Sequence, residues 1–74
     1  MINIQDIIPF MKKGWVAMDS DGEWYWFPLE PYIKSDEWLF RGGSGYLEAT
    51  CISSLFDIAP ADEWTKSLIK VGGK

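Results

Sequence analysis

The sequence predicts an α+β fold, in which a small antiparallel sheet of three to five strands is flanked by two short helices. Apolar residues near the N-terminus recur with helical spacing, and a second helical stripe follows Pro60. Between them, short aromatic segments alternate with turn-forming residues, which is typical of hairpins. At 74 residues the chain has room for one domain, and we expect a single domain over residues 1–74.

The N-terminal segment, residues 2–13, predicts a short helix that is kinked or interrupted. Four apolar side chains fall on one helical face: Ile4, Ile7, Ile8 and Met11. Asn3 is a suitable N-cap, and Gly14 stands where a glycine would end the helix. Pro9 opposes a regular helix because it lacks the N–H that would bond to the carbonyl of Gln5.

The central segment predicts a series of short strands. Residues 15–18 and 23–27 would pair as a hairpin around the turn formers of residues 19–22. Pro28 and Pro31 would end the second strand, since proline cannot donate to a ladder. Further strands are expected at residues 32–33, 38–40 and 46–53, with a glycine-rich, flexible loop over residues 41–45.

The C-terminal segment predicts a helix that begins at Pro60. Ala61, Trp64 and Leu68 would share its apolar face, with acids near its start and lysines near its end, as the helix dipole favours. The expected core draws on every predicted element: Ile4, Ile7, Trp15, Ala17, Trp24 or Tyr25, Leu47, Cys51, Trp64 and Leu68.

The composition excludes several classes of function. Eleven acids against seven bases give a net charge of −4, which disfavours direct binding to nucleic acid. No apolar run approaches the length of a membrane span, and the N-terminus lacks the pattern of a signal peptide. A lone cysteine without an export signal is typical of a reducing compartment, so we expect a cytoplasmic protein.

The sequence predicts no enzyme, no cofactor and no metal site. There is no histidine to act as a base for Cys51 or for a serine nucleophile. Aligning Gly22 with the glycine of a calcium-binding loop puts Ala17 and Pro28 where the loop requires acidic ligands. Two carboxylate pairs are the nearest candidates for acid–base catalysis: Asp19 with Asp21, and Asp36 with Glu37. Both fall in predicted turns, where acids are usually solvated and have ordinary pKa values.

Five tryptophans in so short a chain are the main indication of function. Trp24 and Trp26 share one face of their strand, and Tyr25 and Phe27 share the other. Either the N-terminal helix and the proline-rich segment cover both faces, or one face is an exposed aromatic patch of the kind that marks a binding site.

A binding module is therefore the predicted function, and a partner protein with a basic surface is its expected ligand. The candidate protein-binding residues are Trp24, Trp26, Trp38, Asp36 and Glu37. The alternative is a carbohydrate-binding domain in which Trp24, Trp26 and Trp38 stack on sugar rings. A chain without disulfide or metal also has reason to self-associate, so a homodimer through Trp26 and Trp38 is a further prediction.

Two short motifs carry a resemblance. The segment 15–19 reads Trp-Val-Ala-Met-Asp and is followed by Asp21-Gly22, and the segment 64–69 reads Trp-Thr-Lys-Ser-Leu-Ile. Together they resemble small proteins encoded by bacteriophages and prophages, over about residues 14–70. The resemblance implies a mobile-element origin and a role in binding and inhibiting a host protein, such as a defence or nucleic-acid enzyme. It implies no individual site residues.

Overall fold

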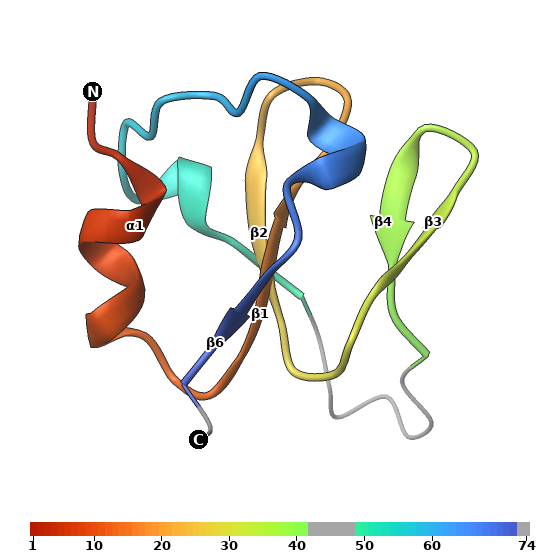
Figure 1. Ribbon diagram of the computed structural model, residues 1–74, viewed down its shortest axis with the longest axis horizontal. Coiled ribbons are helices and arrows are strands. Elements are labelled where there is room, and N and C mark those ends of the chain that lie inside the picture. The colour runs from red at the N-terminus through yellow and green to blue at the C-terminus, as the bar shows by residue number, and fades with distance from the viewer. Residues whose placement is uncertain (42–48, 73–74) are drawn as a thin grey trace.

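The computed structural model describes residues 1–41 and 49–72, and this part of the chain is built mostly from short strands (Figure 1). The glycine-rich segment of residues 42–45, Leu47 and the start of the strand expected at 46–53 lie outside the described residues. The elements follow in the order α1 (Ile4–Ile7), η1 (Ile8–Phe10), β1 (Gly14–Met18), β2 (Trp24–Phe27), β3 (Tyr32–Lys34), β4 (Glu37–Leu39), β5 (Thr50–Cys51), η2 (Ile52–Ser54), η3 (Trp64–Lys66) and β6 (Ile69–Val71).

The prediction of a sheet flanked by two helices is wrong. Within residues 1–41 and 49–72, α1 is the only α-helix, and it is four residues long. Four antiparallel strands form the main sheet in the order β5-β2-β1-β6, and β3 pairs with β4 in a separate two-stranded sheet. Figure 1 shows α1 on one side of the main sheet and the β3–β4 hairpin on the other.

The hairpin of β1 and β2 confirms the prediction made from its turn residues. Met18 faces Trp24 and Trp15 faces Phe27 across the ladder. The Asp19 N–H donates to the carbonyl of Glu23 at 2.9 Å, and Gly22 has a φ of +89°, a conformation that L side chains rarely adopt. The turn therefore depends on glycine at position 22.

The N-terminal helix is interrupted, as expected. The Asn3 side chain caps α1 by accepting from the Gln5 N–H at 2.9 Å. Pro9 lies in the first turn of η1, so the α-helical bonding pattern stops at Ile7 and the chain tightens into a 3₁₀ turn.

The helix predicted to begin at Pro60 does not form. The single 3₁₀ turn η3 is followed directly by the strand β6, in which Ile69 pairs with Val16 of β1. Ile69 and Val71 are β-branched and favour strands, and Lys70 between them is exposed while Val71 is buried. Residues that the spacing of apolar side chains had placed in a helix therefore pair with the open edge of β1 as a strand.

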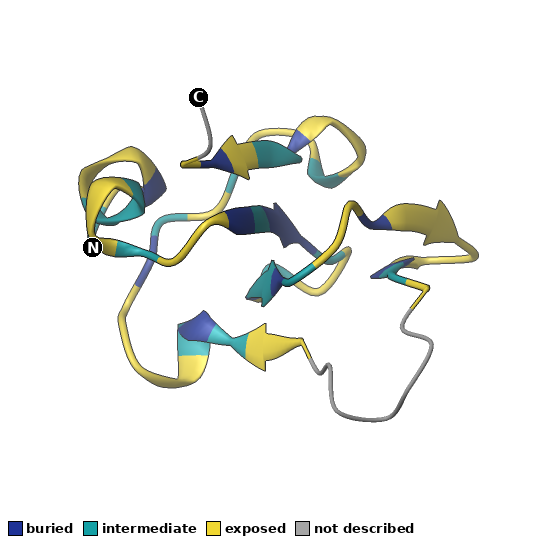
Figure 2. Cartoon of the chain, turned by 90° about the horizontal axis from the view of Figure 1, so that it is seen from below, coloured by how far each residue is buried: buried dark blue, intermediate teal, exposed yellow. Residues whose placement is uncertain are grey.

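The main sheet is covered on both faces (Figure 2). This confirms the expectation that both aromatic faces of β2 are buried, and not the alternative of an exposed aromatic patch. One face buries Trp24 against α1, η2 and the segment around Ile58. On the other face, Phe27 and Ala17 pack against Trp38. The second cover is therefore the β3–β4 hairpin, with Trp64 and Leu68 beside it, rather than the proline-rich segment alone.

The core predictions divide into three groups. Ile4, Ala17 and Trp24 are buried as expected. Half-buried residues from the same prediction line the edges of the core: Ile7, Trp15, Tyr25, Cys51, Trp64 and Leu68. Sequence reasoning missed most of the remaining buried side chains: Val16, Met18, Phe27, Trp38, Ile52, Ile58 and Val71.

Two serine hydroxyls extend the sheet where its outer strands end. The N–H of Met18 in β1 donates to Ser67 Oγ, and the N–H of Trp24 in β2 donates to Ser53 Oγ, both at 2.7 Å. The Ser67 hydroxyl can in turn donate to the Trp64 carbonyl at 2.7 Å. These side chains bond to strand N–H groups that neither β6 nor β5 is long enough to reach.

Replacing Ser67 is expected to destabilise the fold. Ser67 is 4% exposed, so Ser67→Ala leaves the Met18 N–H buried without its acceptor. The free energy of unfolding should fall by about 1–3 kcal/mol. Urea denaturation followed by tryptophan fluorescence measures the change. Ser54→Ala, at an exposed hydroxyl, should change it by less than about 0.5 kcal/mol, and an equal loss in both variants would contradict the assignment.

Candidate functional site

The β1–β2 and β3–β4 turns meet at one end of the molecule. The Ser20 hydroxyl donates to the carbonyl of Asp36 at 2.8 Å, and the Trp38 N–H donates to Asp19 Oδ1 at 2.9 Å. These two bonds join segments that are 16 and 19 residues apart. They bring together five carboxylates, which we call the acidic end: Asp19, Asp21, Glu23, Asp36 and Glu37.

The electrostatics of Asp19 show that these charges influence one another. Burial raises the pKa of the Asp19 carboxyl above its ordinary value of 3.8, and the carboxylates of Asp21, Glu37 and Glu23 raise it further. The hydrogen bond from the Trp38 N–H acts in the opposite direction, because it favours the ionised form. Asp19 therefore lies in a negative potential that a cationic group would relieve.

The raised pKa predicts a pH-dependent difference between the wild-type protein and Asp19→Asn. The folded protein binds a proton at Asp19 more tightly than the unfolded chain, so ionisation lowers stability as the pH rises above 3.8. Asparagine keeps an acceptor for the Trp38 N–H and removes the charge. At pH 7 the variant should be more stable by less than about 1 kcal/mol, since Asp19 is only half-buried and water screens its neighbours.

Denaturation curves at a series of pH values test this prediction. The difference in stability between Asp19→Asn and the wild type should shrink as the pH falls toward 3.8, where the wild-type carboxyl becomes neutral. A difference that stayed constant between pH 7 and pH 4 would show that the charge of Asp19 has no part in it.

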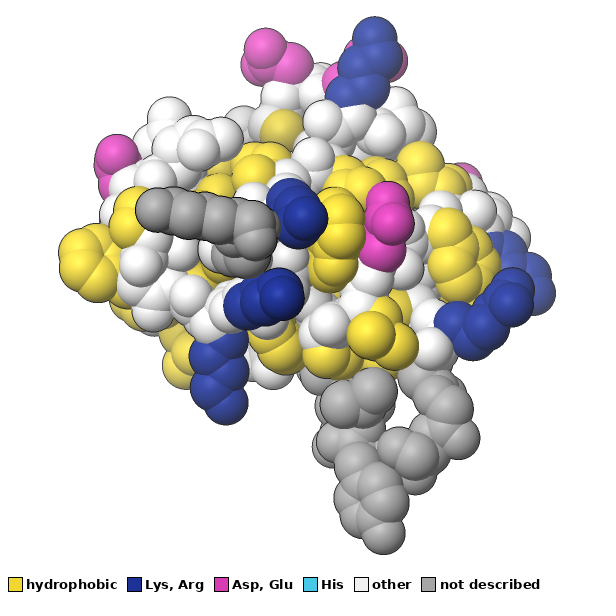
Figure 3. Space-filling model, turned by 60° about the horizontal axis from the view of Figure 1, so that its bottom comes forward, with side chains coloured by type: hydrophobic (Ala, Val, Ile, Leu, Met, Phe, Trp, Pro, Cys, Tyr) yellow, Lys and Arg dark blue, Asp and Glu magenta, His cyan; other side chains and the backbone are white. Residues whose placement is uncertain are grey.

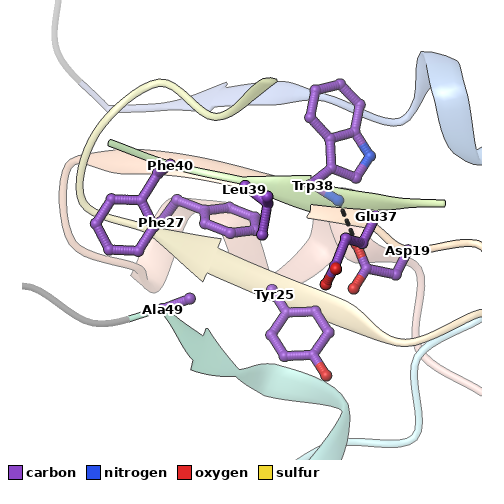
Figure 4. Close-up of a pocket in the computed structure, with 8 residues that line it drawn as sticks. All are labelled: Asp19, Tyr25, Phe27, Glu37, Trp38, Leu39, Phe40 and Ala49. Atoms are coloured by element: carbon purple, nitrogen blue, oxygen red, sulfur yellow. Dashed lines mark hydrogen bonds between the residues drawn. The ribbon is translucent and has the colours of Figure 1, made fainter. Parts of the chain in front are cut away.

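A groove opens beside the acidic end, between β2 and β4 (Figure 4). It has a volume of about 270 Å³ and is lined by Asp19, Tyr25, Phe27, Glu37, Trp38, Leu39, Phe40 and Ala49. The ring centres of Tyr25 and Phe27 lie 6.3 Å apart, and those of Phe27 and Phe40 lie 5.9 Å apart in an edge-to-face arrangement. We call this feature the aromatic groove.

The chemistry of the aromatic groove is acidic at one end and aromatic at the other. In Figure 4 the carboxylates of Asp19 and Glu37 lie together, away from the rings of Phe27 and Phe40. Burial and the neighbouring Cys51 raise the pKa of Tyr25 to about 12, so its hydroxyl is neutral at pH 7. Within the described lining, formal charge at pH 7 comes only from the two carboxylates.

The structure separates the five residues that the sequence predicted as a binding surface. Trp24 and Trp38 are buried, 2% and 7% exposed, and their indole N–H groups donate to the carbonyls of Ala59 and Trp64 at 3.1 and 3.2 Å. Trp26 is half-buried and donates to the carbonyl of Lys12 at 3.1 Å. The three indoles therefore do not form one stacking surface.

Asp36 and Glu37, in contrast, are exposed at the acidic end. Sequence reasoning placed Asp19 in a turn and weighed it with Asp21 as a carboxylate pair, but left it out of the binding surface, and it did not group Tyr25, Phe27 and Phe40 as the wall of a groove. The alternation of Tyr25 and Phe27 on one strand face was the available signal for part of that wall.

The opposite end of the sheet is basic. Lys12 and Lys13 precede β1, and Gly72, which follows β6, lies beside Lys13. Lys70 pairs across the ladder with Trp15, and its ammonium lies 5.8 Å from the centre of the Trp15 ring. Figure 3 shows Lys and Arg side chains among apolar ones on the lower face, with most of the visible carboxylates near its rim. Lys12, Lys13 and Lys70 thus lie near the start of β1, far from the acidic end, whereas Lys34 pairs with Glu37 across the β3–β4 ladder and lies beside the acidic end.

Other kinds of site find no support in the described residues. No group of three or more acidic or cysteine side chains in residues 1–41 and 49–72 is arranged to hold a metal ion. None of the helices there combines the length and apolar character needed to cross a bilayer.

Comparisons with models of known families, with curated proteins and with solved structures give no significant match. The site geometry is therefore the basis of the functional argument.

Proposed function

We propose that this protein is a non-enzymatic binding module whose acidic end engages a basic surface on a bacterial or host protein. The observation that carries the proposal is the pair of hydrogen bonds, from Ser20 to Asp36 and from Trp38 to Asp19, that fixes two acidic turns side by side. One bond holds the Asp19 carboxylate itself, and the other holds the backbone of Asp36, so the two segments need less ordering on binding than two unconnected turns would.

The clustering of five carboxylates at the acidic end supports the same function. Such a cluster is attracted by the field of a basic partner before contact, which orients the molecule and speeds association. Nucleic-acid enzymes carry basic surfaces because they bind phosphates. An inhibitor that occupies such a surface in the bacterial cytoplasm is the form of this function that we propose, and it agrees with the resemblance to phage-encoded proteins.

An affinity capture experiment from bacterial lysate tests the proposal. The tagged protein should retain one or a few proteins with basic surfaces, and moderate salt or heparin, a polyanion, should release them, because both compete with the acidic end. A capture that retains no specific protein, or one whose bound protein resists both salt and heparin, would argue against an electrostatic interface.

The burial of Trp24 and Trp38 bears on the predictions of carbohydrate binding and of a homodimer. Stacking on sugar rings needs exposed indole faces, and Trp24 and Trp38 have almost none, so we do not propose carbohydrate binding. The homodimer remains a prediction for the half-buried Trp26 alone, since the side chain of Trp38 is occupied within the chain. Light scattering on the wild-type protein and on Trp26→Ala would show whether such a dimer forms.

A further inference from the structure

We propose that the aromatic groove receives one arginine side chain of the partner protein. This inference rests on the proposed function and specifies how the acidic end recognises its partner. The groove lies directly beside the acidic end, and Asp19 and Glu37 belong to both. A basic surface that docks on the acidic end would therefore bring cationic side chains to the mouth of the groove.

The size of the groove favours a single side chain. Pockets for small-molecule ligands usually measure about 300–1,000 Å³, and this groove, at about 270 Å³, is at the small end of that scale. A long, unbranched side chain lying along the groove would place its head beside Asp19 and Glu37, which Figure 4 shows together.

The chemistry of the lining favours a guanidinium over an ammonium. A guanidinium is planar and weakly hydrated, so it stacks on aromatic faces and pairs with carboxylates through two parallel N–H groups. A lysine ammonium is a compact and strongly hydrated charge, and it gains less from aromatic walls. Tyr25 supplies an aromatic wall nearest the carboxylates, and Phe27 and Phe40 extend it.

The position and the acidic surroundings of the Asp19 carboxylate also favour a guanidinium ligand. One of its oxygens, Oδ1, accepts from the Trp38 N–H, which holds the carboxylate at the groove. A guanidinium beside it would relieve the repulsion from the neighbouring acids of the acidic end. Glu37, the first residue of β4, is exposed and can complete the ion pair from the other side.

A peptide titration observed by NMR tests the inference without the partner. The probes are blocked tripeptides with a central arginine, lysine or citrulline between glycines; citrulline matches the shape of arginine without its charge. The arginine peptide should shift the backbone amides of Tyr25, Phe27 and Leu39 in a saturable way at millimolar concentrations. Lysine should bind several-fold more weakly, and citrulline should cause no saturable shift.

A matched pair of variants separates the groove from the acidic end as a whole. Glu37→Gln, which changes a residue lining the groove, should weaken arginine binding by about three- to fivefold. Asp36→Asn removes the same charge from the neighbouring residue, which does not line the groove, and should change binding by less than about twofold. Equal losses in both variants, equal binding of lysine and arginine, or shifts confined to residues 20–23 and 35–36 would overturn the inference.

The outcome is distinguishable from failure of the proposed function. If the lysate capture finds a basic partner whose binding is unchanged by Glu37→Gln and the peptides do not bind the groove, the groove assignment is wrong and the binding function stands. If the arginine peptide binds as described but no partner is captured, the groove assignment stands and the proposed function loses its support.

Discussion

Replacing Trp24 with alanine is expected to lower the free energy of unfolding by about 3–5 kcal/mol, the range for large aromatic truncations in a core. Trp24 is among the largest fully buried side chains of the described structure, and it packs with Val16, Met18 and Ile52 on one face of the sheet. The variant also loses the indole N–H that donates to the carbonyl of Ala59. A domain of this size has little stability to lose, so we expect it to be largely unfolded at 37 °C.

Circular dichroism and thermal melting measure this effect, with Phe10→Ala as the matched control. Phe10 is 88% exposed, and its truncation should change the stability by less than about 0.5 kcal/mol. If Trp24→Ala folded with a stability within about 1 kcal/mol of the wild type, the assignment of Trp24 to the core would be wrong, and a role at a binding surface would have to be considered again.

Replacing Trp38 with alanine is expected to loosen the β3–β4 hairpin from the main sheet. Trp38 is the hairpin residue buried against Ala17 and Phe27, and its indole N–H donates to the carbonyl of Trp64. The free energy of unfolding should fall by about 3 kcal/mol, the lower part of the range for such truncations. Alanine keeps the backbone N–H that donates to Asp19, but that N–H moves with the loosened hairpin, so the two segments of the acidic end should separate.

Residue-resolved hydrogen exchange distinguishes this local effect from global unfolding. In Trp38→Ala, the amides that pair β3 with β4 should lose protection more than the amide of Val16 in the main sheet. The control is Ile33→Ala, because Ile33 faces Trp38 across the ladder and is 40% exposed. A uniform loss of protection in Trp38→Ala would show that the hairpin and the sheet form one cooperative unit.

The β1–β2 hairpin could be predicted because all its signals are local. The segment 19–22 contains the turn formers and a glycine that accepts a positive φ, and the flanking residues alternate in the pattern of strands. The interruption at Pro9 is also local, since a proline blocks the helical bond whatever the tertiary context.

The C-terminal segment could not be predicted in the same way. Ala61, Trp64 and Leu68 satisfy helical spacing, but the residues that follow complete the open edge of β1, which is far away in the sequence. Strand formation there depends on a long-range pairing, and helical periodicity in a short window does not exclude it. The apolar alternation of Ile69 and Val71 was the local signal that competed with it.

The candidate site was predictable only in part. The exposure of Asp36 and Glu37 follows from the expectation that acids in turns are solvated; the structure exposes both, with Asp36 in the turn and Glu37 at the start of β4. The joining of their turn to that of Asp19 depends on hydrogen bonds between segments distant in the sequence. The burial of Trp38 could not be read from its neighbours either, since a three-residue apolar strand is equally suited to a core or to a surface.

The affinity of the captured partner for two charge-matched variants tests most directly the claim that the acidic end is the binding surface. The acidic-end variant carries Glu23→Gln, Asp36→Asn and Glu37→Gln, and the control variant carries Asp6→Asn, Glu30→Gln and Asp57→Asn. All six side chains belong to exposed residues, and both variants lose three negative charges. Calorimetric titration should show a loss of about tenfold or more for the acidic-end variant, or about 1.4 kcal/mol, and less than about twofold for the control. Equal losses in the two variants would mean that only net charge matters, and would contradict the account.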